Sequence, residues 1–418
     1  MPVSILPPPP TATPRTATPR TATSRSGTPS GLAKTTAPKL GPRMPGPRLF
    51  QVMRVGLVVW TLLSTVLCLA SILASQSHQQ SSAGAMVHAQ DLRDLRSEVS
   101  HAQSLALASL LDPQTDEGAD RWDSYLGSRT QIDLLLLTSA ASADHPTDLG
   151  GVADFLRVWQ ENLSVAHHDA LAPETSGIDV RDVTASFDDV MAAIGAESSA
   201  TADQGSSSTP FIVLSIVASV LGGLGFVVVS VVTARRSHRV INIGLSIGLL
   251  AIIAAIVAVG IYASRSADIA TTDSRAATLS QAQSDVWTAQ AQDILSVLEP
   301  DSWQSHTASA GDLILSAQHN LAGFPALNLS PSDISTLGQT QSTIASTEDL
   351  ETRKELVTNE TPWKDVADTI GTLIDQQRPD SHNLVVPAVG YVITVATCCV
   401  IAIIATLAGI HARTKEYL

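Results

Sequence analysis

The stretch that decides the fold is VMRVGLVVWTLLSTVLCLASILA, residues 52–74, which contains no acidic residue and one base, Arg54, near its start. In a helix that rises about 1.5 Å per residue, roughly 20 apolar residues span the hydrocarbon core of a bilayer. The chain that follows contains no proline before Leu111 and keeps apolar residues at helical spacing. The sequence therefore predicts a membrane span, 51–74, that continues outward as one helix.

The same pattern returns later in the chain. Five residues recur in the same order 187 positions further on. The first set is Ala102, Gln103, Ser109, Leu111 and Pro113, and the second set is Ala289, Gln290, Ser296, Leu298 and Pro300. The spans 51–74 and 240–263 keep nearly the same offset, and a match that shares its register with the spans is more than a similarity of composition. We therefore expect an internal duplication.

Three more runs reach spanning length and contain no Asp, Glu, Lys or Arg, namely 210–233, 240–263 and 384–410. The N-terminal segment 1–50 contains seven basic residues and no acidic residue, and basic residues also occur in the tail 411–418. The linker 234–239 between the second and third spans holds Arg235, Arg236 and Arg239. The positive-inside rule then predicts a multi-pass plasma-membrane protein with both termini and this linker in the cytoplasm.

The two long segments between spans, 75–209 and 264–383, are therefore expected outside the cytoplasm. They carry 38 of the 39 acidic residues of the chain and 12 of its 25 basic residues. Nucleic acid is excluded as a partner, because the basic segments are short and lie next to the membrane. These basic segments are better suited to anionic lipid headgroups.

Prolines and glycines divide each external segment into helices. In the first, we expect helices at about 118–143, 148–171 and 178–199 in addition to the end of the entering helix. In the second, we expect a helix at about 302–322 and two further helices. Ser330 is the expected N-cap of one, before Pro331, and Thr361 is the expected N-cap of the other, before Pro362. The predicted fold is all-α, with four transmembrane helices and two extracytoplasmic four-helix-bundle domains.

The two entering helices, 52–111 and 240–298, contain no proline, whereas each helix that leads back to the membrane is interrupted. Gly205 and Pro210 interrupt the first return, and Pro379 interrupts the second. Such a pattern suits a device that carries a displacement across the bilayer, and it equally suits loose packing.

Residues 1–50 are rich in proline and threonine and contain too few apolar residues to form a core, so we expect a disordered tail. Thr13, Thr18 and Thr28 lie beside proline or arginine and are candidate phosphorylation sites for a cytoplasmic kinase. The alternative is a plain flexible tether.

Catalytic motifs of hydrolases, kinases and zinc enzymes do not occur in the sequence, so we expect no enzyme and no cofactor. Three aromatic residues, Trp122, Tyr125 and Trp303, follow the prolines that close the first helix of each external segment. They are expected at the membrane-distal tips, where they either dock a partner or plug the end of a bundle.

The external segments resemble the four-helix sensory domains of bacterial chemoreceptors and histidine kinases, whose large cytoplasmic output module is not found in this sequence. The whole layout, with four spans, two external helical regions, a basic Pro- and Thr-rich N-terminus and a short C-terminal tail, resembles the GlnX-type membrane proteins of corynebacteria and mycobacteria. The resemblance implies a sensor of external amino acids that is read through a solute-binding lipoprotein of the GlnH type. It also implies a cytoplasmic partner of the Ser/Thr protein kinase G type.

The function predicted from the sequence is therefore transmembrane signal transduction. An envelope scaffold or assembly adaptor is the first alternative, and a small transporter is the second. Charged groups that transporters place at mid-membrane are missing from these spans, and the glycines of the second and third spans are explained by close helix contacts. Assembly as a homo-oligomer stays open.

Overall fold

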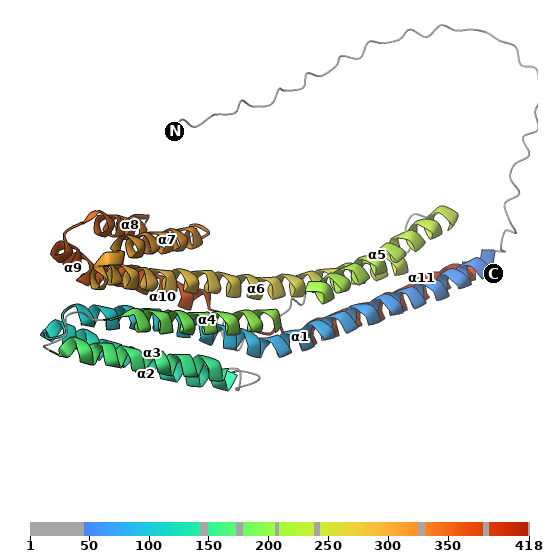
Figure 1. Ribbon diagram of the computed structural model, residues 1–418. Coiled ribbons are helices and arrows are strands. Elements are labelled where there is room, and N and C mark those ends of the chain that lie inside the picture. Colours follow the sequence, from blue (N-terminus) through green and yellow to red (C-terminus); the bar gives the residue numbers. More distant parts are fainter. Residues whose placement is uncertain are drawn as a thin grey trace, which may run out of the picture. The chain divides into compact units, whose positions relative to one another are not determined.

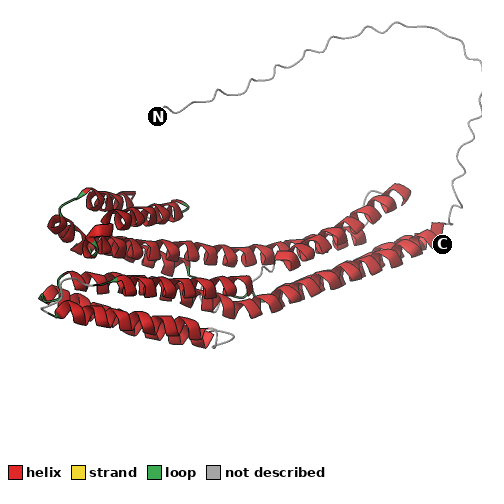
Figure 2. Ribbon diagram, viewed as in Figure 1, coloured by secondary structure: helices red, strands yellow, loops and turns green. Residues whose placement is uncertain are grey.

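The computed structural model describes residues 46–142, 149–172, 179–204, 209–237, 243–324, 331–378 and 384–416. Within these ranges the regular elements are all helices, and no strand occurs (Figure 2). Four helices contain a stretch that is long and apolar enough to cross a membrane, namely Gln51–Leu111, Pro210–Val232, Ile243–Leu298 and Ala388–Ala412. The predicted all-α membrane protein with four spans is confirmed.

The two entering helices are continuous. Helix α1 is Gly46–Leu111 and helix α6 is Ile243–Leu298, and they contain 66 and 56 residues. At about 1.5 Å per residue these helices are roughly 100 Å and 84 Å long. Helix α1 begins before the expected start at residue 51, because Pro47 lies in its first turn, where a backbone N–H has no helical acceptor.

The first half of the chain, residues 46–237, contains the helices expected from its prolines. They are α2 (Asp116–Ser142), α3 (Gly150–Leu171), α4 (Arg181–Gln204) and α5 (Thr209–Ser237). Helix α5 extends beyond the expected end of the second span at residue 233.

The second half, residues 243–416, contains one helix more than expected. After α6 come η2 (Pro300–Ser302), α7 (Trp303–Ala322), α8 (Pro331–Ser346), α9 (Leu350–Thr358), α10 (Thr361–Gln377) and α11 (Ala388–Glu416). The additional helix α9 begins where the Asp349 side chain accepts a hydrogen bond from the Thr352 N–H, at 2.9 Å.

Two details of the second half differ from the expected caps and span. Thr361 is the first residue of α10, and Glu360 occupies the N-cap without a side-chain cap hydrogen bond. The expected N-cap Ser330 lies outside the described residues. The fourth span was expected from residue 384, but α11 begins only at Ala388, after Pro387.

Helices α1 and α6 run side by side in the same direction (Figure 1). Hydrogen bonds that join the two helices link residues 180 to 188 positions apart, over the stretch from Ser75 to Ser100 of α1. A nearly constant separation requires parallel helices, since in an antiparallel pair it would change steadily with position. Residues of α1 therefore face residues of α6 at the same height.

The buried apolar residues outside the membrane form one continuous cluster that draws on both halves. Two separate bundle domains were expected, but the faces of α1 and α6 that meet are rich in alanine and serine. Ala102, Ala106 and Ala289 are fully buried. These small side chains allow the two long helices to approach closely, so the two halves share one core.

Within the membrane, glycines mark close helix contacts, as the sequence predicts. A Cβ atom at Gly244 of α6 would lie 2.5 Å from the Ala405 carbonyl oxygen and 2.6 Å from the Gly409 Cα of α11. A Cβ atom at Gly225 of α5 would lie 2.5 Å from the Trp60 ring of α1. Helices α6 and α11, and likewise α1 and α5, can pack at these distances only because the side chain is absent.

Candidate functional site

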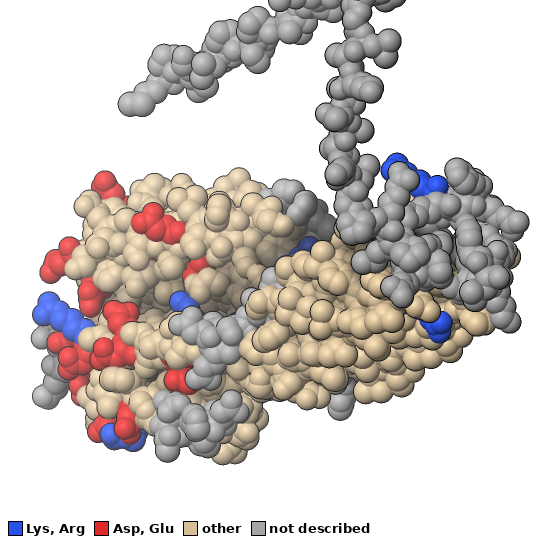
Figure 3. Space-filling model, turned by 90° about the vertical axis from the view of Figure 1, so that its right-hand side faces the viewer, with Lys and Arg blue, Asp and Glu red and all other residues tan. Residues whose placement is uncertain are grey.

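Charge is distributed unevenly over the surface. In Figure 3, Asp and Glu gather on one part of the face shown, and the described surface of the other part is mostly uncharged, with a few Lys and Arg. Large apolar side chains of the spans, such as Leu63 and Val66 of α1, are exposed, as is expected of lipid-facing residues. A polar binding site would therefore lie outside this apolar surface or inside the bundle of spans.

A hollow lies at the membrane-distal end, between the two halves. Its volume is about 530 Å³. It is lined by α1, by the first turns of α2 and by the α9–α10 junction, through Leu105, Glu117, Asp120, Arg121, Ser124, Glu355, Thr358, Asn359, Glu360 and Thr361. We call this hollow the tip cavity.

Arg121 is the only base of the tip cavity lining, which also contains four acids. Its guanidinium donates to Glu117 at 2.6 Å within α2, and across the halves to Glu360 at 3.1 Å and to the Thr358 carbonyl oxygen at 3.3 Å. Nearby, Lys354 of α9 bonds Asp112 at the end of α1. The two halves are thus joined by charged contacts at their far end.

Tyr125 does not lie on the surface, which corrects the expectation that it contacts a partner. Its side chain is fully buried, and burial raises its pKa to about 12. The ring packs against Trp122 at 4.7 Å and meets the edge of Trp159 at 6.3 Å between centroids. Tyr125 is therefore part of an aromatic plug inside the first half.

The two predicted tip tryptophans are each covered on one face. The Trp122 ring stacks on His167 of α3 at 3.7 Å between centroids. The Arg353 guanidinium lies 4.1 Å from the Trp303 ring centroid and donates to the carbonyl oxygens of Thr347 and Ser296. Trp122 and Trp303 are partly exposed, so both stay predicted docking residues.

Between the tip and the membrane, short polar side chains join α1 to α6. Ser97 donates to the Gln283 side chain at 3.0 Å, and the hydroxyls of Ser100 and Ser284 lie 3.0 Å apart. Sequence reasoning did not single these residues out. The signal in the sequence was the presence of serines at helix positions where a bundle core would have leucines, and the structure shows that these serines are buried.

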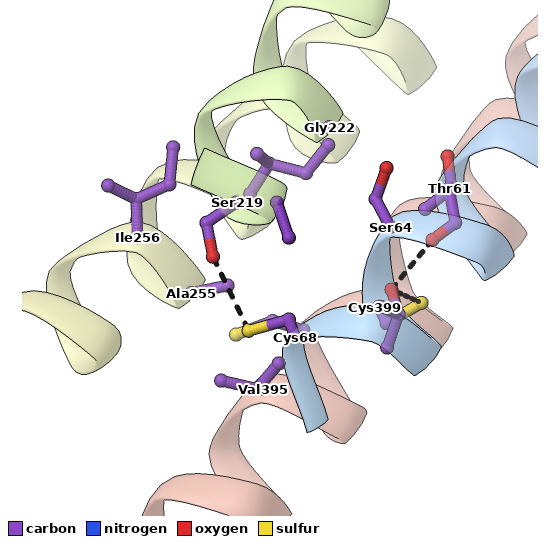
Figure 4. Close-up of a pocket in the computed structure, with 13 residues that line it drawn as sticks. Thr61, Ser64, Cys68, Ser219, Gly222, Ala255, Ile256, Val395 and Cys399 are labelled. Atoms are coloured by element: carbon purple, nitrogen blue, oxygen red, sulfur yellow. Dashed lines mark hydrogen bonds between the residues drawn. The ribbon is translucent and has the colours of Figure 1, made fainter. Parts of the chain in front are cut away.

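A second, smaller cavity lies inside the span bundle (Figure 4). Its volume is about 40 Å³, and hydroxyl, thiol and small apolar groups line it. Thr65 donates to the Cys399 sulfur at 2.8 Å, and the Cys68 sulfur lies 3.4 Å from the Ser219 oxygen. Such a space accommodates a water molecule or two and carries no charged side chain.

One cluster has the residue types of a catalytic triad. His88 lies 3.1 Å from the Ser139 hydroxyl and 3.4 Å from the Glu197 carboxylate. Ser139 is fully buried within α2 and lines neither cavity, so a substrate cannot reach its oxygen. The three side chains instead join α1, α2 and α4.

The remaining predicted site residues lie near or beyond the limits of the described chain. Arg235 and Arg236 belong to the last turns of α5, and the Arg235 side chain is exposed. Thr13, Thr18, Thr28 and Arg239 lie outside the described residues. No group of His, Cys, Asp and Glu among the described residues could hold a metal ion.

No protein-family model, curated protein or solved structure matches this chain. The class is therefore defined by the fold alone, as an all-helical membrane protein with four apolar helices. Its distinguishing features are the tip cavity between the halves and the polar contacts along α1 and α6.

Proposed function

We propose that the protein is a signal-transducing receptor of the plasma membrane, with both termini in the cytoplasm. It senses extracytoplasmic amino acids through a solute-binding lipoprotein of the GlnH type and relays the signal to a cytoplasmic Ser/Thr kinase of the protein kinase G type. The ligand class and both partners come from the layout-level resemblance.

One observation carries the proposal, namely that α1 and α6 run unbroken from the span bundle to the membrane-distal end. A continuous helix transmits an axial or rotational displacement, whereas a helix with a break absorbs it. The short hydroxyl side chains between α1 and α6 favour small relative movements, because serine contacts interlock less than leucine contacts do. A partner at the tip cavity would thus act on both halves together.

The register of α1 against α6 supports an internal duplication as the origin of this design. Gln79 contacts Ser266, and Ser75 contacts Tyr262, at separations of 187 residues, which is the offset of the sequence repeat. Positions that correspond in the repeat therefore face one another. This is the arrangement expected of two copies related by a two-fold axis between the two long helices.

We place the lipoprotein at the tip cavity and at the partly exposed rings of Trp122 and Trp303. The acidic lining favours a partner that presents basic side chains and disfavours direct capture of acidic amino acids. On the other side of the membrane, the arginines at the end of α5 would meet anionic lipid headgroups.

Cross-linking in intact membranes followed by purification of the protein tests this function. The expected result is co-purification of a solute-binding lipoprotein and a Ser/Thr kinase. Arg121→Glu, which breaks the bonds of Arg121 to Glu360 and to the Thr358 carbonyl oxygen across the halves and so deforms the tip cavity, should release the lipoprotein and leave the kinase bound. Arg157→Glu is the matched control, because Arg157 is exposed and its ion pair among the described residues is with the neighbouring Glu161. Equal capture of the lipoprotein by both variants would refute docking at the tip cavity.

A small transporter is the second candidate, and the hydroxyl- and thiol-lined cavity within the spans favours it. Substrate flux into proteoliposomes that contain the purified protein would support transport. Flux that is lost in Ser219→Leu, a variant that fills the cavity, would establish transport in place of signalling.

A further inference from the structure

Gln79 of α1 joins three segments of the chain near the outer end of the span bundle. Its amide nitrogen donates to the Ser266 hydroxyl of α6 at 3.0 Å and lies 3.4 Å from the Tyr262 hydroxyl. Its carbonyl oxygen accepts the backbone N–H of Val386 at 3.2 Å. The Tyr262 hydroxyl in turn donates to Ser75 at 3.2 Å, which closes the network between α1 and α6.

The bond to Val386 has a physical reason. Val386 is buried in the non-helical segment directly before α11, and Pro387 follows it. A buried backbone N–H that has no helical acceptor must find another one, because an unpaired buried N–H is destabilising. Gln79 provides that acceptor, so the start of α11 depends on a side chain of α1.

We call this network of Gln79, Ser75, Tyr262, Ser266 and Val386 the Gln79 junction. Packing next to the Gln79 junction extends the same connection into the membrane. Tyr262 is fully buried and meets the Tyr391 ring of α11 edge-on at 5.3 Å between centroids. Val386 and Ala388 belong to a buried cluster that includes residues of α1 and α6. A displacement of α1 relative to α6 therefore alters the surroundings of the first turn of α11.

The junction is asymmetric between the halves. Ser266 is the residue of α6 that corresponds to Gln79, and its hydroxyl already accepts from Gln79 and donates to the Tyr262 carbonyl oxygen. A serine side chain is also two carbon–carbon bonds shorter than a glutamine side chain. The junction therefore favours α11 over α5 as the helix that follows the two long helices.

We propose that Gln79 is a positioning residue that couples the paired helices α1 and α6 to α11, so that the signal leaves the membrane through the C-terminal span. This inference rests on the proposed function, because it assigns the route of the same transmembrane signal.

Amide hydrogen exchange of the full chain in lipid nanodiscs tests the local bond. Gln79→Leu keeps the size of the side chain and removes both hydrogen-bonding groups, so the Val386 amide should exchange at least tenfold faster. Gln79→Glu keeps an oxygen acceptor and should restore the protection of Val386. Gln80→Leu, the same change at the exposed neighbouring position, should have no effect. Unchanged exchange at Val386 in Gln79→Leu would overturn the proposal.

A second experiment tests the route of the signal. Arg121→Glu weakens the contact between the halves at the tip cavity, and we expect it to speed exchange at residues 384–391 when Gln79 is present. In the double variant with Gln79→Leu, the tip substitution should add nothing further. An equal added effect with and without Gln79 refutes the route through this residue and leaves the proposed function standing. If Arg121→Glu changes exchange only at the tip, transmission itself fails, and this proposal fails with it.

Discussion

Replacing Asp293 by asparagine is expected to remove one component of the pH dependence of stability. Asp293 lies in α6 at the core of the second half and is fully buried. Neither of its carboxylate oxygens has a hydrogen-bond partner among the described residues, nor does the side-chain amide oxygen of Gln290 one turn earlier. Burial without a partner raises the pKa of Asp293 well above its usual value of 3.8.

The sign and size follow from proton linkage. Between the ordinary pKa and the raised one, the folded protein holds a proton on Asp293 that the unfolded chain has released. Stability from this group is therefore greatest below about pH 4 and falls as pH rises, by about 1.4 kcal/mol per pH unit, until the raised pKa is reached. Asp94 and Asp285 also have raised pKa values caused mainly by burial, so they add slopes of the same sign. These slopes are common to the wild type and the variant.

The assay is denaturant unfolding of the full chain in a neutral detergent, followed by tryptophan fluorescence at pH 4.5 and pH 5.5. The wild type should lose more stability than Asp293→Asn between these two values, by up to about 1.4 kcal/mol. Asp301→Asn, which changes an exposed carboxyl, should follow the wild type. Parallel curves for the wild type and Asp293→Asn would refute the assignment of a buried, protonated carboxyl.

Two further substitutions test the packing. Gly244→Val places atoms against the Ala405 carbonyl oxygen and should lower stability by about 1–3 kcal/mol in thermal unfolding, whereas Gly260→Val, with open space around it, should have almost no effect. Trp159→Phe removes the 2.7 Å hydrogen bond to the Gln103 oxygen and leaves a buried acceptor, which should cost about 1–3 kcal/mol in denaturant unfolding. A Trp159→Phe protein as stable as the wild type would show that this bond contributes nothing.

Much of the fold could be predicted from the sequence, because its strongest determinants are local. Long uncharged runs identify the spans, and proline and glycine positions identify most helix ends. Helix α9 was missed because the break after Ser346 contains neither residue. The signal there was weaker, an aspartate, Asp349, that caps the next helix through the Thr352 N–H.

The shared core and the Gln79 junction could not be predicted, because both depend on which faces of two distant helices meet. Helical periodicity identifies a buried face but does not name its partner. For the same reason the aromatic residues near the tip looked equivalent in the sequence. Only the packing of α2 against α3 shows that Tyr125 is enclosed and that Trp122 is not.

The in-register pairing of α1 and α6 has an evolutionary consequence. In a homodimer, every residue at the symmetry axis is encoded once and must serve on both sides. When both sides belong to one chain, each can mutate independently, and glutamine can face serine at corresponding heights. Under the proposed duplication, a single chain can carry different residues at corresponding positions of its two halves, whereas identical subunits carry the same residue at both.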